Sequence, residues 1–397
     1  MNSAVPEGWT RHKLGDSLSP RPKSKFPSGE SNPLGYYDFY VCSYKVLKSF
    51  HNEYSSPSIL LSTGGEASVH FATERYAFST DVWATEFDGD ICNEYVFRLL
   101  EENIGTINYS GFQGSGIKHL DKSFIEKLEF SIPPLPEQKK IASILTSVDE
   151  VIENTQKQID KLQDLKKATM NELLTKGIGH TEFKDSELGR IPKSWEVKRL
   201  KEVTIKIRDG NYGADYPSAS EMLKTGVPFL TSTVIGKNQK IDRGKLKYIS
   251  REKHAQLSKA HIRTNDVLFT NRGANVGNVA VVSADLDDAN IGPQLTFLRV
   301  NEHISSEYLY ETLQSRNFKF QLNSLDSGSA MNFFGVGTTE RLQIVVPPIN
   351  EQNKIVFALS SISKTIEEKQ RKLDQTQSLK KSLMQDLLTG KVRVTVN

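Results

Sequence analysis

Positive charge gathers in two stretches of the sequence, and positive charge is what a protein needs to bind the phosphates of nucleic acid. Residues 237–272 carry ten Lys or Arg against three acids, and residues 11–25 carry five against one. Such runs are also typical of solvated faces, and we interpret about half of these side chains in that way. Reading of bases would need Arg, Lys, Asn or Gln on loops. The candidate contacts are Arg21, Lys23, Lys25, Asn211, Tyr212, Lys245, Lys247, Arg263, Asn271, Arg272 and Asn275.

The residues of known catalytic sites do not occur at their required spacing. Both Pro-Pro pairs lack the preceding Asn or Asp and the following aromatic residue with which adenine methyltransferases hold a flipped base. No Gly-x-x-x-x-Gly-Lys-Ser/Thr loop or nucleophile elbow is present. The glycine-rich residues 111–116 precede a predicted strand, so a structural turn is a better interpretation than a dinucleotide loop. The eight histidines show no metal-ligand spacing. We therefore expect a non-catalytic chain without a metal site.

Composition sets wide limits on the class of protein. The chain has 397 residues, enough for two or three domains, and a net charge of only +3, which argues neither for nor against a nucleic-acid partner. Its two cysteines, Cys42 and Cys92, allow no disulfide framework. No apolar region follows a basic start, and no apolar run approaches the roughly 20 residues that span a bilayer. We expect a soluble, cytoplasmic protein with no membrane contact.

A long repeat must position the candidate residues. The stretch from Ile132 to Ile178 aligns without a gap to the stretch 214 residues later, with 20 identities in 47 positions. Each copy begins with Pro-Pro, which forces an extended start, and continues without Gly or Pro from Glu137 to Lys176 and from Glu351 to Thr389. A repeat at this period indicates a duplicated module.

Each copy is predicted to form a long helix with a narrow apolar seam. Apolar residues recur at threes, fours and sevens, which is the spacing of a coiled coil. One such helix alone could be a spacer or an oligomerisation arm. Two copies in one chain favour an antiparallel pair in which each seam buries the other. The seams are Ile141, Leu145, Val148, Ile152, Ile159, Leu162 and Leu173, and Ile355, Leu359, Ile362, Ile366, Leu373, Leu383 and Leu387.

Two globular heads precede the two helices. Pro6 and Trp9 of the first head correspond to Pro192 and Trp195 of the second, so the repeat extends beyond the helices. Both heads mix strand and helix patterns. We expect strands at 36–46, 58–62 and 124–132, and helices at 93–102 and 308–320. The predicted divisions are a first head 1–135, a helix 136–176, a linker 177–190, a second head 191–349, a second helix 350–390 and a tail 391–397.

The two helix starts, PPLPEQKKIASIL and PPINEQNKIVFAL, together with GIGHTEFKDSELGRIPKSWEVKRL between the heads, resemble the specificity subunits of type I restriction-modification systems. The resemblance covers essentially the whole chain. It implies an α+β fold with two target recognition domains, separated by two long helices packed as an antiparallel coiled coil in a pseudo-twofold repeat. Each head would read one half of a bipartite target in double-stranded DNA, and the helices would set the spacer.

The resemblance also implies that partners perform the chemistry. Two DNA adenine methyltransferase (modification) subunits and ATP-dependent restriction subunits would bind S-adenosylmethionine, ATP and Mg, with no cofactor on this chain. Exposed residues at the helix starts are our candidates for partner docking: Glu137, Gln138, Glu351 and Gln352. Two other interpretations stay open: a single-chain restriction-modification relative with a divergent catalytic site, and a coiled-coil scaffold that binds only proteins.

Overall fold

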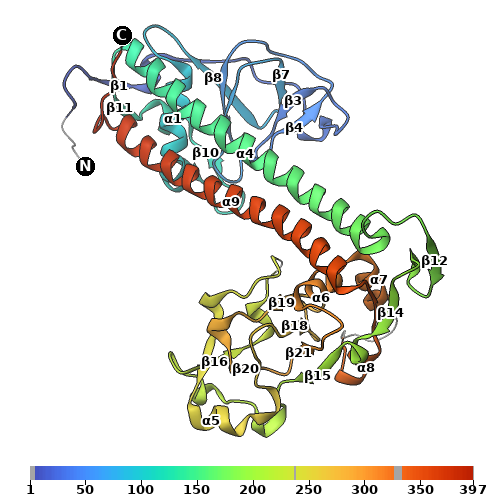
Figure 1. The fold of residues 1–397 in the computed structure, drawn as a ribbon. Helices are drawn as coiled ribbons and strands as arrows, with labels where there is room; N and C mark the ends of the chain where they lie inside the picture. The colour runs from blue at the N-terminus through green and yellow to red at the C-terminus, as the bar shows by residue number, and fades with distance from the viewer. Residues whose placement is uncertain (1–4, 237, 326–332, 397) are drawn as a thin grey trace. The chain divides into compact units, whose positions relative to one another are not determined.

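The computed structural model describes residues 5–236, 238–325 and 333–396 (Figure 1). The chain forms two compact units. The first comprises Met1–Gln158 with Lys369–Asn397, and the second comprises Ile159–Glu368. Each unit contains one head of mixed α and β structure and parts of two long helices, so the expected mixed fold class is confirmed. The unit boundaries fall inside the helices, and the predicted domain divisions stay a prediction.

The first head is built on a four-stranded antiparallel sheet in the order β2-β8-β5-β6. A three-stranded sheet, β4-β3-β7, pairs β3 with β7 in parallel, and two further pairs are β1-β11 and β9-β10. The bounds are β1 Thr10–Lys13, β2 Leu18–Pro20, β3 Tyr37–Tyr40, β4 Leu47–Ser49, β5 Ser58–Ser62, β6 Val69–Ala72, β7 Tyr76–Phe78, β8 Val82–Phe87, β9 Phe112–Gln113, β10 His119–Leu120 and β11 Glu129–Ile132.

The second head repeats this topology in its two sheets and in the pair formed by its first and last strands, while the described residues of this head form no strand pair equivalent to β9-β10. Its sheets run β15-β21-β18-β19, β17-β16-β20 with β16 parallel to β20, and β14-β22. The two heads therefore share one fold, although their sequences diverge. The bounds are β14 Glu196–Arg199, β15 Thr204–Asp209, β16 Val227–Leu230, β17 Lys247–Ile249, β18 Val267–Thr270, β19 Val279–Val281, β20 Asn290–Ile291, β21 Leu295–Val300 and β22 Gln343–Val346.

Short helices complete the heads, and the central strands β5 and β18 are buried on both faces. In β5, Ile59 and Leu61 join one apolar cluster while Leu60 joins another. This follows from the twofold side-chain period of a strand that is covered on both sides. The helices are α1 Asn93–Glu102, α2 Ile104–Thr106 and α3 Lys122–Glu126 in the first head, and α5 Arg251–Gln256, α6 Ser306–Leu313, α7 Arg316–Leu325 and α8 Val336–Arg341 in the second.

The long helices are α4 (Leu135–Lys176) and α9 (Ile349–Leu388). In the first unit, Ile141 and Leu145 near the start of α4 share a buried cluster with Met384 and Leu387 near the end of α9. In the second unit the ends are reversed, because Leu174 near the end of α4 shares a cluster with Ile355 and Leu359 near the start of α9. Within each unit the two helices therefore run antiparallel, as the matched seams predict. None of the described helices has the length and apolar character needed to cross a bilayer.

Three local expectations needed correction, and the linker proved to have a defined structure. The predicted strand 36–46 is shorter, being β3 (Tyr37–Tyr40) only. The predicted strand 124–132 is α3 followed by β11. The predicted helix 308–320 is two helices, α6 and α7, because the chain turns at Gln314 and Ser315. The glycine-rich linker contains an antiparallel hairpin of β12 (Phe183–Ser186) and β13 (Gly189–Pro192).

Candidate nucleic-acid interface

The loop that follows the central strand of the second head brings several candidate residues together. Arg272 follows β18 and forms an isolated antiparallel bridge with Phe333. The guanidinium carbon of Arg272 lies 4.0 Å from the centre of the Phe333 ring and 5.9 Å from that of Tyr212. Aromatic contact on its flat faces leaves the N–H edge of a guanidinium free to donate. Arg272 is half-buried, so its aromatic neighbours restrict its orientation.

A buried carboxylate organises the neighbouring side chains. Asp209, at the end of β15, accepts a hydrogen bond from the Tyr212 hydroxyl and pairs with Lys259 Nζ at 2.5 Å. Lys259 Nζ also lies 5.0 Å from the centre of the Tyr212 ring. Partial burial, with Asp209 beside the hydroxyl, raises the pKa of Tyr212 to about 12, so this phenol stays neutral and keeps donating at physiological pH. We call Asp209, Tyr212, Lys259, Arg272 and Phe333 the Arg272 cluster.

Two candidate asparagines of the same loop have structural roles. Asn271 is fully buried, and its Nδ2 donates to Thr296 Oγ1 at 2.8 Å and to the Pro293 carbonyl at 3.2 Å. The prediction that Asn271 reads a base is wrong, because its amide lies inside the sheet. Asn275 is half-buried and donates to the Ser232 carbonyl at 3.4 Å. Asn211 adjoins Tyr212, and its Nδ2 lies 3.5 Å from Asp215 Oδ2.

The other basic candidates of the second head are exposed but are not part of the Arg272 cluster. Lys245 pairs with Asp242 at 3.4 Å, and Lys247 lies on β17 in the other sheet. Arg263 precedes β18 whereas Arg272 follows it, so the strand separates them. Lys237, which belongs to the basic stretch, lies outside the described residues. DNA contact by Lys245, Lys247 and Arg263 stays a prediction.

The first head presents a different loop at the equivalent place. Gly64 follows β5 and bridges to His119, just as Arg272 follows β18 and bridges to Phe333. Arg21 of this head is held at 2.7 Å by Glu86 and donates to Ser56, so it stabilises the sheet edge. Lys23 and Lys25 are exposed. The two heads thus place unlike residues on one framework.

The proposed docking residues at the helix starts are not exposed. Gln138 is 1% exposed: its Nε2 donates to the Pro133 and Asp90 carbonyls, and its Oε1 accepts from the Cys92 N–H. Gln352, 0% exposed, makes the same three bonds with Pro347, His303 and Ser305. Each glutamine therefore binds its helix to its own head.

The adjacent glutamates are also occupied within the chain. Glu137 is 4% exposed and accepts two hydrogen bonds of 2.7 Å from Arg393. Glu351 accepts from Trp195 Nε1, His180 Nε2 and the Ile178 N–H at 2.8–2.9 Å. The expectation that these four side chains form an exposed surface is wrong, because the glutamines satisfy backbone groups beside each Pro-Pro pair and the glutamates accept from donors elsewhere in the chain.

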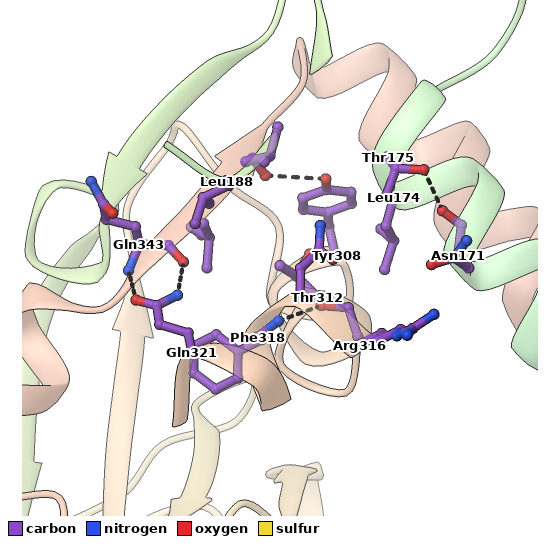
Figure 2. A pocket seen from close by; sticks show the side chains of 14 residues that line it. Asn171, Leu174, Thr175, Leu188, Tyr308, Thr312, Arg316, Phe318, Gln321 and Gln343 are labelled. Atoms are coloured by element: carbon purple, nitrogen blue, oxygen red, sulfur yellow. Dashed lines mark hydrogen bonds between the residues drawn. The ribbon is translucent and has the colours of Figure 1, made fainter. Parts of the chain in front are cut away.

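A small cavity in the second unit is a packing feature. Its volume is ≈ 20 Å³, room for about one water molecule, and Figure 2 shows Leu174, Tyr308 and Phe318 around it. Gln321 closes one side by exchanging hydrogen bonds of 2.8 and 3.0 Å with the backbone of Gln343. The cavity is too small for a substrate.

Sequence reasoning missed three members of the Arg272 cluster. Phe333 lies far from Arg272 in sequence, and only the bridge between their backbones brings them together. Lys259 was visible as part of the basic stretch, but nothing in the sequence singled it out. Its partner Asp209 gave no signal either, because its burial depends on the sheet.

The fold and the cluster define a class of proteins in which two related binding heads with unlike loops are joined through paired helices. The family model for the type I restriction modification DNA specificity domain matches residues 6–164 and 192–376. The chain belongs to this family, the specificity subunits of type I restriction-modification systems.

Individual relatives agree with this assignment. The MjaVIII specificity subunit of Methanocaldococcus jannaschii is 31% identical over 98% of this chain and 94% of its own length. The EcoDI specificity subunit of Escherichia coli is 19% identical over 89% of this chain and 80% of its own length. The crystal structure of the S subunit from M. genitalium matches 98% of both chains with a TM-score of 0.67 and 15% identity, which shows the shared fold.

Proposed function

We propose that this specificity subunit reads a bipartite sequence in double-stranded DNA, with one half-site for each head. The observation that carries the proposal is the pair of equivalent loops after β5 and β18, which present Gly64 in one head and Arg272 in the other. A common framework with different side chains at the same place is what two different half-sites require. Arg is the residue most often used to read guanine in the major groove.

The long helices are proposed to set the number of unread base pairs between the half-sites. At about 1.5 Å per residue, each helix extends for roughly 60 Å. Heads that read one face of B-DNA need a separation of about one helical turn, roughly 34–36 Å. Insertion of matched helical turns in α4 and α9 is expected to change the spacer and leave the half-site sequences unchanged.

The chemistry is proposed to reside in partners. Two adenine methyltransferase subunits would supply S-adenosylmethionine-dependent methylation, and restriction subunits would supply ATP- and Mg²⁺-dependent cleavage. No cofactor is assigned to this chain for that reaction. Because Glu137, Gln138 and Gln352 are buried and Glu351 is occupied by three donors of this chain, the proposed docking surface moves away from these side chains. The exposed outer faces of α4 and α9 are the alternative.

Methylome sequencing of a host that carries this chain with its modification subunits tests the proposal. The expected result is one bipartite methylated motif, and replacement of residues 192–346 by the corresponding head of a relative should change one half only. A complete motif that survives this exchange would contradict modular reading.

Incubation of the purified chain alone with DNA, Mg²⁺ and S-adenosylmethionine tests the single-chain enzyme alternative, which predicts methylation or cleavage without partners.

A further inference from the structure

Two histidines and one aspartate of the second head converge on one point, although no metal-ligand spacing is visible in the sequence. His254 Nε2 lies 3.2 Å from Asp288 Oδ2, and His261 Nδ1 lies 3.4 Å from Asp288 Oδ1. The three ligand atoms lie within 4.8 Å of one another. His254 belongs to α5, His261 follows it, and Asp288 lies two residues before β20.

The surrounding hydrogen bonds fix which nitrogen of each imidazole carries the proton. Buried Asn290 donates from Nδ2 to the Leu257 carbonyl, so its Oδ1 is left to accept from His254 Nδ1–H. His261 Nε2–H donates to the His254 carbonyl at 2.9 Å. In the neutral forms, the unprotonated nitrogens are therefore His254 Nε2 and His261 Nδ1, which are the two that face Asp288. This is the arrangement that orients histidine ligands in metal sites.

Three electron-pair acceptors that face one another need a cation between them. A carboxylate opposite two imidazole lone pairs is repulsive unless protons or a metal ion intervene. Imidazole and carboxylate ligands together suit zinc and related divalent ions. Ligands about 2.0–2.1 Å from a tetrahedral ion lie about 3.4 Å apart, and each histidine nitrogen lies at a similar distance, 3.2 or 3.4 Å, from one of the two Asp288 carboxylate oxygens.

We propose that His254, His261 and Asp288 bind a divalent transition-metal ion of the zinc type, with water completing the coordination. The two rings are stacked, with centroids 4.0 Å apart and planes at 14°. Because a metal ion lies near the plane of each ring that binds it, one ring turns about its Cβ–Cγ bond when the ion enters, and the hydrogen bond of that ring to Asn290 or to the His254 carbonyl must adjust with it. Asp288 has φ +59°, a left-handed conformation that a non-glycine residue adopts at some cost and that aims its carboxylate at the histidines.

The ion would fasten a segment that the first head lacks. Residues 250–266 connect β17 to β18, whereas only 50–57 connect β4 to β5. This longer connection contains His254 and His261, and between them Lys259 of the Arg272 cluster. A metal ion would tie the connection to the loop at Asp288 and so restrain the backbone that presents Lys259. The binding itself does not depend on the proposed DNA-reading function.

Zinc titration of the metal-stripped full chain at pH 7.5 tests the proposal. We expect one equivalent of Zn²⁺ to bind and to raise the melting temperature, and Co²⁺ to give visible d–d absorption. His254→Gln, His261→Gln and Asp288→Asn should each weaken Zn²⁺ binding by about tenfold or more. His303→Gln is the control, because this exposed histidine of the same unit lies outside the cluster and should leave binding unchanged.

Three results would overturn the proposal. One is the absence of stoichiometric Zn²⁺ and Co²⁺ binding by the folded unmutated chain, which needs no variant. Another is binding that persists in all three cluster variants. A melting temperature that responds to pH through the cluster but not to Zn²⁺ would show that protons occupy the converging atoms, and the metal assignment would then be wrong.

Discussion

Arg98 and Glu311 occupy equivalent places in the two heads but carry opposite charges. Arg98, on α1, is 5% exposed and pairs at 2.5 Å with Asp149 of α4. Glu311, on α6, is equally buried, and its nearest cation is Lys166 of α4 at 3.8 Å. The 214-residue offset of the long helices makes Asp149 equivalent to Ser363 and Lys166 equivalent to Lys380, which pairs with Asp149 at 2.9 Å. Each head thus matches the charges of the long helices that pack against it.

This relationship predicts that Arg98→Glu destabilises the first unit. A carboxylate would replace a buried cation beside Asp149 and Glu101, at a cost of about 3 kcal/mol in the free energy of unfolding. Arg98→Glu/Glu101→Gln/Asp149→Ser recreates the Glu311, Gln314 and Ser363 set around Lys380 and should recover most of that loss. Chemical denaturation measures both, with exposed Arg75→Glu as the control. Equal stabilities of the single and triple variants would contradict the charge-matching account.

Glu351→Gln is expected to remove an acid-sensitive contribution to stability. Burial by itself raises the pKa of Glu351, but donors from Ile178, Trp195 and His180 outweigh it and hold the pKa below its ordinary value of 4.5. A lowered folded-state pKa means that stability is fully present above about pH 4.5 and is lost as pH falls through the folded value. The variant should lose about 2 kcal/mol at pH 7.

The difference in unfolding free energy between Glu351→Gln and the unmutated chain should shrink as the pH falls below about 4.5. Glu182→Gln is the matched control, because Glu182 pairs with Lys193 at 3.2 Å in an exposed position. Urea unfolding at pH 7, 5 and 3.5 measures the effect. A difference that grows on acidification would mean that the sign of the pKa shift is wrong.

Gly177→Ala is expected to destabilise the second unit by about 2 kcal/mol, because two penalties combine. Gly177, directly after α4, has φ +67°, and an added Cβ would lie 2.6 Å from the Trp195 ring and 2.5 Å from Glu351 Oε1. Gly105→Ala in α2 is the control, since nothing lies within 4 Å of its added Cβ and its φ is ordinary. Thermal unfolding that is the same for both variants would show that this junction relaxes freely.

Arg272→Ala should weaken binding to the mapped target duplex by about tenfold or more, as expected for the loss of one base-reading arginine. The same substitution should weaken binding less when the half-site proposed for the second head is scrambled. Arg341→Ala, which replaces an exposed arginine of α8 that is not a candidate DNA contact, is the control for a change of charge alone. Fluorescence anisotropy of the chain with its modification subunits, measured across salt concentrations, separates base reading from phosphate contact. Equal losses of affinity for the two duplexes would show that Arg272 contacts phosphate and does not read a base.

The sequence by itself determined the features that depend on local periodicity and duplication. The seam of Ile141, Leu145, Ile355 and Leu359 was visible because a helix repeats every 3.6 residues, and the 214-residue offset revealed the pairing of like modules. The basic stretches were also visible, since charge is a property of composition. The helix pairing that these patterns predicted is present in each unit.

Only the tertiary structure decided which side chains are free to act. Asn271 and Gln138 look like ordinary polar residues in the sequence, but strand pairing and the Pro-Pro bend enclose both. The contact of Arg272 with Phe333, and that of His254 with Asp288, join residues far apart in the chain. Such contacts arise from sheet registers that bring separate strands together, and no short-range pattern in the sequence encodes them.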